Sequence, residues 1–241
     1  MKAWEKAALA IAVASTACGL AMGVWAHCMQ KAADEPVPAP LLAVDDRELE
    51  PDRIFPQIDW EAWESVNPDV IGWVTVPGTG VNHPIAQAPG SRPEFYLDHD
   101  SSGRWNPYGC PYLDAECAGL GFDSPLALVY GHHMDDGSMF APLARFSDRE
   151  FAEGHGVILL QTPREKMLLE VVAVDVVDAD AEPEKVSFAS AGEFDEWAST
   201  LLSDADLVLK PDAEPENLVA FCTCSYGKTN ERTIVYAEKA I

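Results

Sequence analysis

The chain has 241 residues and a formal net charge of −24 at pH 7, from 40 acidic and only 16 basic side chains. Because phosphate binding requires a surplus of Lys and Arg, this balance excludes nucleic acid as an expected partner. With 48% hydrophobic residues, the chain suffices for one domain with a full core and a short appendage.

The first patterned segment is an uncharged run near the N-terminus. The 24 residues between Lys6 and Lys31 include no Asp, Glu, Lys or Arg, and as a helix they would measure about 36 Å, enough to cross a bilayer. Lys2 and Lys6 precede the run, which favours a cytoplasmic N-terminus. The sequence therefore predicts residues 1–31 as a cytoplasmic N-terminus and signal-anchor of a single-pass cell-membrane protein with an extracellular domain. A cleaved signal peptide is the alternative.

The next segment, residues 32–56, has five prolines among acidic residues and few large apolar ones. This composition is typical of a semi-extended stalk. The remaining residues, 57–241, are then the expected catalytic domain. They begin with Asp59, which is placed to cap a helix that puts Trp60 and Trp63 on one side, and we expect this helix to pack against a sheet.

From Val70 onward, short apolar and β-branched runs alternate with Gly and Pro turns. This pattern predicts a mainly β fold, a barrel or sandwich rather than a parallel α/β sheet. The expected strands are 71–76, 81–87, 109–113, 126–130, 156–161, 167–177, 218–224 and 232–237.

One helix interrupts the β pattern. Ser190 and Glu193 form a capping box, and the apolar residues after them recur at helical spacing. They are Phe194, Trp197, Ala198, Leu201 and Leu202. The stripe predicts a helix that packs on the core.

The C-terminal segment predicts a hairpin whose strands, 218–224 and 232–237, flank a loop of turn formers. If the strands pair about the middle of that loop, Cys224 and Arg232 stand opposite each other with Cβ atoms about 5 Å apart. A permanent cation beside a thiol favours the thiolate and can bind a developing oxyanion. The pair indicates acyl transfer by cysteine, a reaction that also needs a base.

The candidate base is a histidine after the strand 126–130. His132 follows Gly131, a residue that lets the chain turn, so we expect its side chain to be held by the scaffold yet open to solvent. His133 is its rival and points elsewhere because it is one residue further on.

Together these features resemble the sortase signature. Thr223 and Cys224, with an arginine eight residues later and a Gly-His pair about 90 residues earlier, resemble the TLxTC strand and its partners, although Ala220 and Phe221 replace Thr and Leu. Further segments resemble class B in the same order, and YGHHMDDGSMF is the most specific stretch. These segments are Asn67–Gln87, Phe95–Asp100 and Tyr130–Phe146.

The resemblance implies a closed β-barrel of about eight strands with an N-terminal helix and an extra helix between strands 6 and 7. It selects His132 as acid and base, Cys224 as nucleophile and Arg232 as oxyanion ligand. We also expect Cys222 and Thr223, beside the nucleophile, to contact substrate.

The implied reaction is transpeptidation without a cofactor. A C-terminal sorting signal on a surface protein or pilin is cleaved after Thr through a thioester, and the protein is transferred to an amine of a cell-wall precursor or a pilin lysine. The cytoplasmic membrane is a further expected partner. A hydrolytic cysteine peptidase and a catalytically silent extracellular domain that binds wall polymer are the alternatives.

Metal sites are weakly indicated. Zinc on Cys222, Cys224, His132 and His133 would need a better-spaced ligand set. Calcium near Asp98, Asp100, Asp135 and Asp136 lacks a twelve-residue loop with spaced oxygen ligands. The sequence therefore predicts no metal. Cys110 and Cys117 are left open as either a disulfide or two free thiols.

Overall fold

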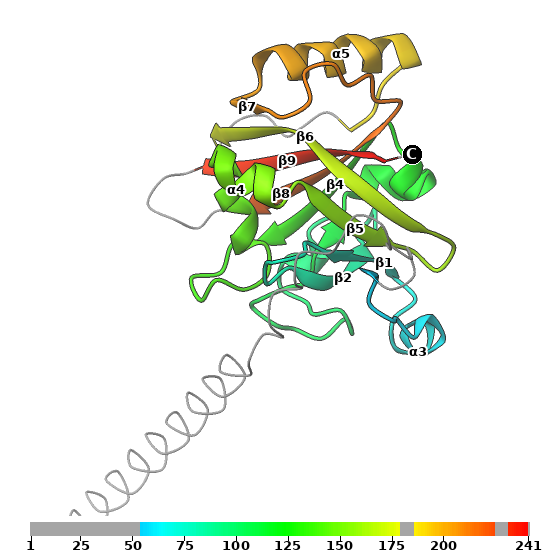
Figure 1. The fold of residues 1–241 in the computed structure, drawn as a ribbon. Helices are drawn as coiled ribbons and strands as arrows, with labels where there is room; N and C mark the ends of the chain where they lie inside the picture. Colours follow the sequence, from blue (N-terminus) through cyan, green and yellow to red (C-terminus); the bar gives the residue numbers. More distant parts are fainter. Residues whose placement is uncertain (1–53, 179–185, 225–230, 241) are drawn as a thin grey trace, which may run out of the picture. The chain divides into compact units, whose positions relative to one another are not determined.

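The computed structural model describes residues 54–178, 186–224 and 231–240. Nine strands form one sheet in the order β5-β1-β2-β3-β4-β8-β9-β6-β7, and β5 also pairs with β6. The pairing of β5 with β6 closes eight strands into a barrel, and β7 is added at the free side of β6 (Figure 1). The predicted closed barrel of about eight strands is confirmed.

The strands match the eight predicted runs and add one that was not predicted, the two-residue β7. Its two residues are too few to show any periodicity. The bounds are β1 Val70–Thr75, β2 Asn82–Gln87, β3 Tyr112–Leu113, β4 Leu126–His132, β5 Val157–Gln161, β6 Lys166–Asp178, β7 Leu207–Val208, β8 Leu218–Cys224 and β9 Glu231–Lys239.

Both predicted helices are present. In α3 (Trp60–Val66), the Asp59 carboxylate accepts the N–H of Ala62 at 2.9 Å, and the ring of Trp63 lies 6.1 Å from that of Trp73 in β1. No residue of α3 is buried, so this aromatic contact joins the helix to the sheet. The predicted N-terminal helix is thus confirmed.

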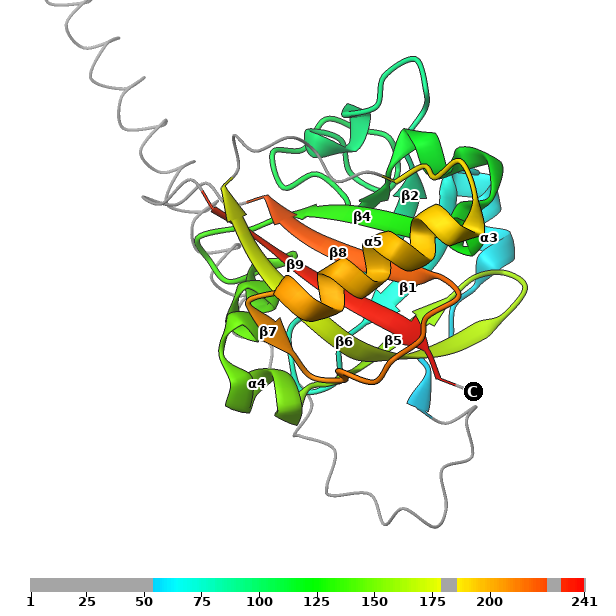
Figure 2. The ribbon, with the colours of Figure 1, turned by 90° about the horizontal axis from the view of Figure 1, so that it is seen from above.

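The second helix, α5 (Ala191–Asp204), lies between β6 and β7 in the chain, as predicted. The Ser190 hydroxyl accepts the N–H of Glu193 at 3.2 Å, which begins the helix at the expected residue. Phe194 is buried, and the Trp197 ring lies 6.1 Å from that of Tyr236 in β9. Figure 2 shows α5 lying across the outer face of β8 and β9.

Shorter helical turns, which the sequence did not predict, fill the connections. They are the 3-10 turns Phe95–Leu97, Ala115–Gly119, Gly121–Asp123 and Ala141–Ser147, and the helix α4 (Arg149–Gly154). Each spans at most seven residues, about two turns, which is too short for a recognisable apolar stripe.

The strands β4 and β8 run parallel and side by side in the middle of the sheet. Nearly all their described side chains are buried, and the turn 141–147 packs against β8. For example, the rings of Phe140 and Phe221 pack edge to face with their centres 6.2 Å apart. The core therefore holds the ends of the strands β4 and β8.

The predicted single-pass membrane localisation requires correction. Among the residues that the structure describes, no helix is long and apolar enough to cross a membrane. The longest, α5, has 14 residues and measures about 21 Å, against a hydrocarbon core of about 30 Å. The localisation prediction is contradicted by this finding and is abandoned. The uncharged run between Lys6 and Lys31, and the predicted stalk as far as residue 53, lie outside the described residues.

Candidate active site

Two of the predicted site residues stand at the ends of the paired strands β4 and β8. The parallel ladder joins seven residue pairs, from Leu126 with Leu218 to His132 with Cys224. Because neighbouring strands lie about 4.8 Å apart, the backbones of His132 and Cys224 are adjacent although 92 residues separate them in the chain. An imidazole and a thiol thus start from neighbouring positions.

The third predicted residue lies on the other side of β8. The antiparallel ladder of β8 and β9 runs from Val219 with Ala237 to Cys222 with Ile234. Continued by two residues, the same register brings Cys224 opposite Arg232. On this extended register the three predicted residues would form a row across β4, β8 and β9.

The substrate contacts predicted for Cys222 and Thr223 stay predictions. Their side chains are only 2% and 1% exposed. The hydroxyl of Thr223 accepts the N–H of Thr233 at 3.0 Å and donates to the carbonyl oxygen of Thr233 at 3.3 Å. This pair ties β8 to β9 one residue before Cys224.

His132 is less open than the sequence indicated. Its side chain is 6% exposed, and its Nε2 lies 2.6 Å from the carbonyl oxygen of Leu97. The reason is that β4 continues through Gly131 and His132 instead of turning at the glycine. A Cβ atom at Gly131 would lie 2.5 Å from the ring of Phe140. Gly131 is therefore needed for the close approach of Phe140, and this packing holds the strand end that carries His132.

The remaining cysteines of the described region are buried thiols. Cys110 and Cys117 are free, so the disulfide considered from the sequence is not formed. Burial raises the pKa of the Cys110 thiol to about 12 and also raises the pKa of Cys117. A thiol with so high a pKa holds little thiolate at neutral pH and is a poor nucleophile.

A cleft of about 860 Å³ opens beside His132, and the sequence analysis did not predict it. Its walls come from the connection between β2 and β3 and from the end of β4. The lining residues are Arg92–Phe95, Leu97, Asp98, Trp105, Pro107 and His132–Asp135. A sequence signal for it was Trp105, an aromatic residue in a connection that carries Glu94, Asp98 and Asp100.

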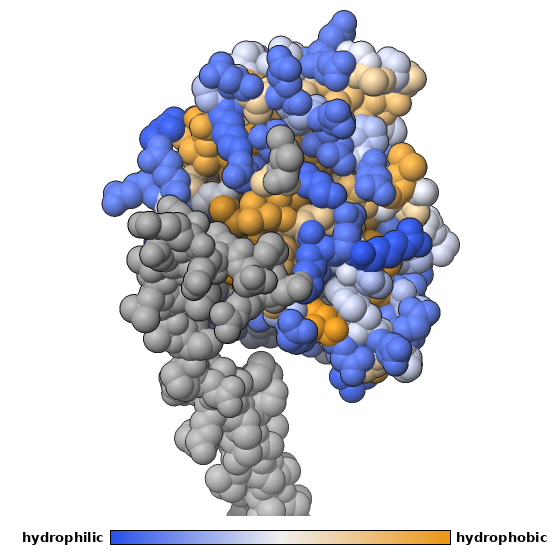
Figure 3. All heavy atoms as spheres, turned by 45° about the vertical axis from the view of Figure 1, so that its right-hand side comes forward, coloured by the Kyte–Doolittle hydropathy of each residue, from blue (hydrophilic) through white to orange (hydrophobic). Residues whose placement is uncertain are grey.

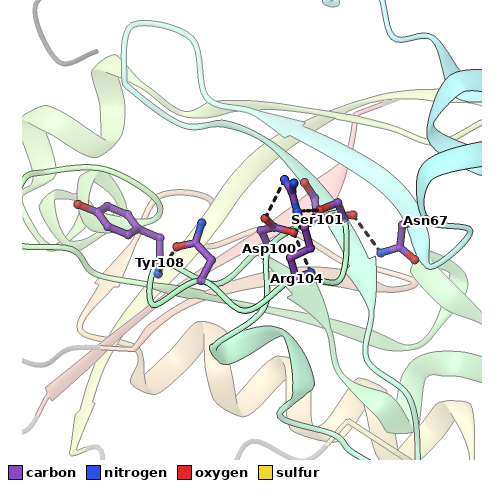
Figure 4. A network of polar contacts seen from close by, with 7 residues as sticks. Asn67, Asp100, Ser101, Arg104 and Tyr108 are labelled. Atoms are coloured by element: carbon purple, nitrogen blue, oxygen red, sulfur yellow. Dashed lines mark hydrogen bonds and ion pairs between the residues drawn. The ribbon is translucent and has the colours of Figure 1, made fainter. Parts of the chain in front are cut away.

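The connection that forms one wall is held in shape by polar contacts around Asp100 (Figure 4). Its carboxylate accepts the N–H of Ser102 at 2.9 Å and the hydroxyl of Ser102 at 2.6 Å, and Arg104 approaches it at 3.4 Å. Asn67 donates to the carbonyl oxygen of Ser101 at 3.0 Å. Partial burial acts to raise the pKa of Asp100, but the hydrogen bonds outweigh it and lower the pKa.

The two walls are joined to each other by a hydrogen bond. The Tyr108 hydroxyl donates to the carboxylate of Asp136 at 2.9 Å, and the same carboxylate accepts the N–H and the hydroxyl of Ser138. The contact with Asp136 raises the pKa of Tyr108. The connection 88–111 and the loop after His132 therefore form one preformed unit.

Neither metal alternative gains support from the geometry. Within the part of the chain that the structure describes, no three or more His, Cys, Asp or Glu side chains gather as a metal site.

The barrel with α5 inserted after β6 is the fold of solved class B sortases. A substrate complex of sortase B from Staphylococcus aureus superimposes with a TM-score of 0.64 at 22% identity, over 75% of this chain and 83% of that one. Sortase B from Bacillus anthracis, solved in complex with AAEK1, gives 0.63 at 25% identity over the same shares.

The sequence is similar to that of known sortases. The sortase domain model matches residues 74–240, and sortase B of Staphylococcus aureus (strain NCTC 8325 / PS 47) is 24% identical over 197 residues, 78% of this chain and 76% of that protein. Sortase B of Listeria monocytogenes is 23% identical over 170 residues, 70% and 68% of the two chains. This chain therefore belongs to the sortase family, as a class B member and a cysteine transpeptidase.

Proposed function

We propose that this enzyme cleaves a C-terminal sorting signal after a threonine and joins that threonine to an amine. In this proposal residues 57–241 are the catalytic domain, Cys224 is the nucleophile, His132 the general acid and base, and Arg232 the ligand of the oxyanion. The observation that carries the assignment is the ladder of β4 and β8, in which His132 and Cys224 are direct partners. The burial of Cys110, Cys117 and Cys222 supports it further.

The first half-reaction forms a thioester. The thiolate of Cys224 attacks the threonine carbonyl, and the resulting oxyanion is stabilised by Arg232 and backbone N–H groups. The carbon–nitrogen bond then breaks, and His132 gives its proton to the departing amine.

The second half-reaction replaces the lost amide. An acceptor amine attacks the thioester, His132 takes a proton from it, and the carbon–sulfur bond breaks to restore the thiolate of Cys224. The donor is a surface protein or pilin with the sorting signal, and the acceptor is an amine of a cell-wall precursor or a pilin lysine. The substrate complex of the Staphylococcus aureus relative supports a peptide donor.

The test uses the full chain with a library of peptides that contain one threonine at a fixed position. Cleavage is followed by mass spectrometry with and without Nα-acetyl-lysinamide as acceptor. We expect an amide product that increases with amine concentration, and no cleavage by Cys224→Ala.

Each other outcome has a definite meaning. Hydrolysis that ignores the amine would identify a hydrolytic cysteine peptidase. Full cleavage by Cys224→Ala would overturn the assignment of the nucleophile. A wild-type chain that cleaves no peptide of the library would favour the silent wall-binding domain.

A further inference from the structure

One ring nitrogen of His132 is held by a backbone carbonyl from the β2–β3 connection. Its Nε2 lies 2.6 Å from the carbonyl oxygen of Leu97, in a side chain that is 6% exposed. A carbonyl oxygen only accepts hydrogen bonds, so Nε2 carries a hydrogen and donates it. A neutral imidazole has a single N–H, so the lone pair of neutral His132 is on Nδ1. The contact with Leu97 therefore selects one tautomer of the ring.

The carbonyl of Leu97 belongs to a turn that is too short to hold its own position. The 3-10 turn Phe95–Leu97 has three residues, and 3-10 hydrogen bonds are weaker than those of an α-helix. The buried residue of the turn is Tyr96, which is 1% exposed and packs in a small core cluster with Cys110 and Tyr112. Tyr96 is therefore the side chain that anchors the turn.

The hydroxyl of Tyr96 is fixed by a donor and an acceptor. It accepts the Nδ2–H of Asn67 at 2.8 Å and donates to the carboxylate of Asp69 at 2.9 Å. Asn67 is 8% exposed and caps the C-terminal end of α3, and Asp69 directly precedes β1. Burial raises the pKa of Tyr96, so the hydroxyl stays protonated and remains a donor to Asp69 at neutral pH. The ring thus ties the turn to the segment that joins α3 to β1.

The backbone at Gly109 and Cys110 contacts the same turn. The N–H of Cys110 donates to the carbonyl oxygen of Tyr96 at 2.9 Å. A Cβ at Gly109 would lie 2.4 Å from that oxygen and 2.6 Å from the carbonyl oxygen of Leu97. The absence of a side chain at Gly109 therefore leaves room for the carbonyl that His132 contacts.

We propose that Tyr96 is a positioning residue for His132, and that Nδ1 is the ring nitrogen that exchanges protons in both half-reactions. The assignment rests on the proposed function and names the atom that performs its proton transfers. In the first half-reaction the proton on Nδ1 passes to the departing amine nitrogen, and the electron pair of the N–H bond stays on Nδ1. In the second, Nδ1 takes a proton from the acceptor amine. The hydrogen on Nε2 stays on the Leu97 carbonyl throughout.

Tyr96 acts on the chemical step rather than on binding. Its side chain is buried and is not exposed to a substrate, so its influence on the reaction passes through the turn and the ring of His132. Without the hydroxyl, the turn loses its tie to Asn67 and Asp69, and the Leu97 carbonyl selects the tautomer less strictly. The maximal rate then falls, while the donor concentration for half-maximal rate stays within a factor of about two.

The tautomer is measured by nuclear magnetic resonance on the full chain with ¹⁵N-labelled histidine. Long-range ¹H–¹⁵N correlations at the alkaline end of a pH titration identify the nitrogen that carries the hydrogen, and His132→Gln assigns the signals. We expect Nε2–H in the wild type and an average of both tautomers in Tyr96→Phe, which keeps the ring in the core. An Nδ1–H tautomer in the wild type would overturn the proposal.

The matched control is Tyr236→Phe, which removes a hydroxyl from another fully buried tyrosine, in β9. It should keep the wild-type tautomer and the wild-type kcat. Tyr96→Phe should lower kcat about fivefold to tenfold, the effect of losing a contact that orients a reacting group. Urea unfolding measures the stability of both variants in parallel. Equal tautomer patterns and equal kcat values in the two variants would show that Tyr96 only supports the fold.

A second pair of variants separates the hydrogen bond from the charge of Asp69. Asp69→Asn keeps a carbonyl oxygen that accepts from the Tyr96 hydroxyl, so it should retain kcat within about twofold. Asp69→Ala removes the acceptor and should lower kcat about threefold, with the same change in tautomer as Tyr96→Phe but smaller. A wild-type kcat and tautomer in Asp69→Ala together with Tyr96→Phe would overturn the positioning role.

The positioning role and the proposed function fail separately. A wild-type chain that cleaves no donor peptide refutes the proposed function, and the tautomer of His132 with its response to Tyr96→Phe still decides the positioning role. Normal transfer by the wild type, with tautomer and kcat unchanged in Tyr96→Phe, refutes only the positioning role.

Discussion

The candidate active site has a strand side and a loop side, and they are held in different ways. On the strand side, the positions of His132, Cys224 and Arg232 follow from the ladders of β4, β8 and β9. On the loop side, the connection 88–111 is shaped by side-chain contacts around Asp100 and by the close approach of Gly109 to other backbone atoms. A slip of one residue in a ladder turns every side chain to the other face. A loop has no such constraint.

This difference suits a two-substrate enzyme. The reacting groups require fixed relative positions, which buried ladders provide. The loop side can differ in shape and charge without disturbing the core, because loops tolerate such variation. Figure 3 shows one face of the molecule, on which hydrophilic side chains predominate with smaller apolar patches between them.

The largest expected effect concerns His132, the proposed general acid and base on the strand side. His132→Ala should lower transpeptidation about a thousandfold, because a general acid and base contributes typically 10²–10⁴ in rate. The matched control is His133→Ala, one residue further on, which should lose less than about tenfold. Steady-state rates with donor and amine measure both. Equal losses in the two variants would leave His132 without a special role.

The second-largest effect concerns the backbone of the loop side. Gly103 and Gly109 both have positive φ, 75° and 62°. A Cβ at Gly109 would lie 2.4 Å from the carbonyl oxygen of Tyr96, whereas one at Gly103 would meet nothing within 4 Å. Gly109→Ala should therefore lower the free energy of unfolding by about 3 kcal/mol, and Gly103→Ala by about 1 kcal/mol. Urea unfolding of both variants tests this, and equal values would show that the contact at Gly109 relaxes freely.

A third effect returns to the strand side. Arg232→Lys should reduce the rate about a hundredfold, because a lysine lacks the fixed donors of a guanidinium. The proper readout is kcat with the free energy of unfolding measured in parallel, since Arg232 also pairs with Val177 of β6. A normal kcat in a stable Arg232→Lys chain would remove Arg232 from the chemistry.

On the strand side, local patterns predicted the strands and the opposition of Cys224 and Arg232, whereas the resemblance to sortases selected His132. The runs 126–130 and 218–224 are apolar and are followed or closed by Gly131 and Cys224, so two strands were evident. The register of β8 with β9 agrees with pairing about the middle of the loop between them. The continuation of β4 to a buried His132 was missed, because glycine is typical of turns, whereas Gly131 allows the close packing of Phe140.

The loop side could not be predicted in the same way. Residues 92–107 show neither a period of two nor one of 3.6, so no pattern places Trp105 or Asp98 beside His132. Their position depends on tertiary contacts such as the one between Tyr108 and Asp136, which are 28 residues apart.

The smallest expected effect tests the contacts that shape the loop side, through their dependence on pH. Since the hydrogen bonds to Asp100 lower its pKa from the ordinary 3.8, its ionised form is favoured in the folded chain. Its contribution to stability is complete above the ordinary pKa and is lost as the pH falls through the lower folded value. The neutral variant Asp100→Asn lacks this dependence, so wild type and variant should converge in free energy of unfolding as the pH falls from 3.8 through the lower folded pKa. Urea unfolding along this range measures the convergence, because the other carboxylates titrate in both chains and cancel.

Ser102→Ala removes one donor to Asp100 and should show part of the effect. A difference between wild type and Asp100→Asn that stays constant with pH would show that the charge of Asp100 does not shape the loop.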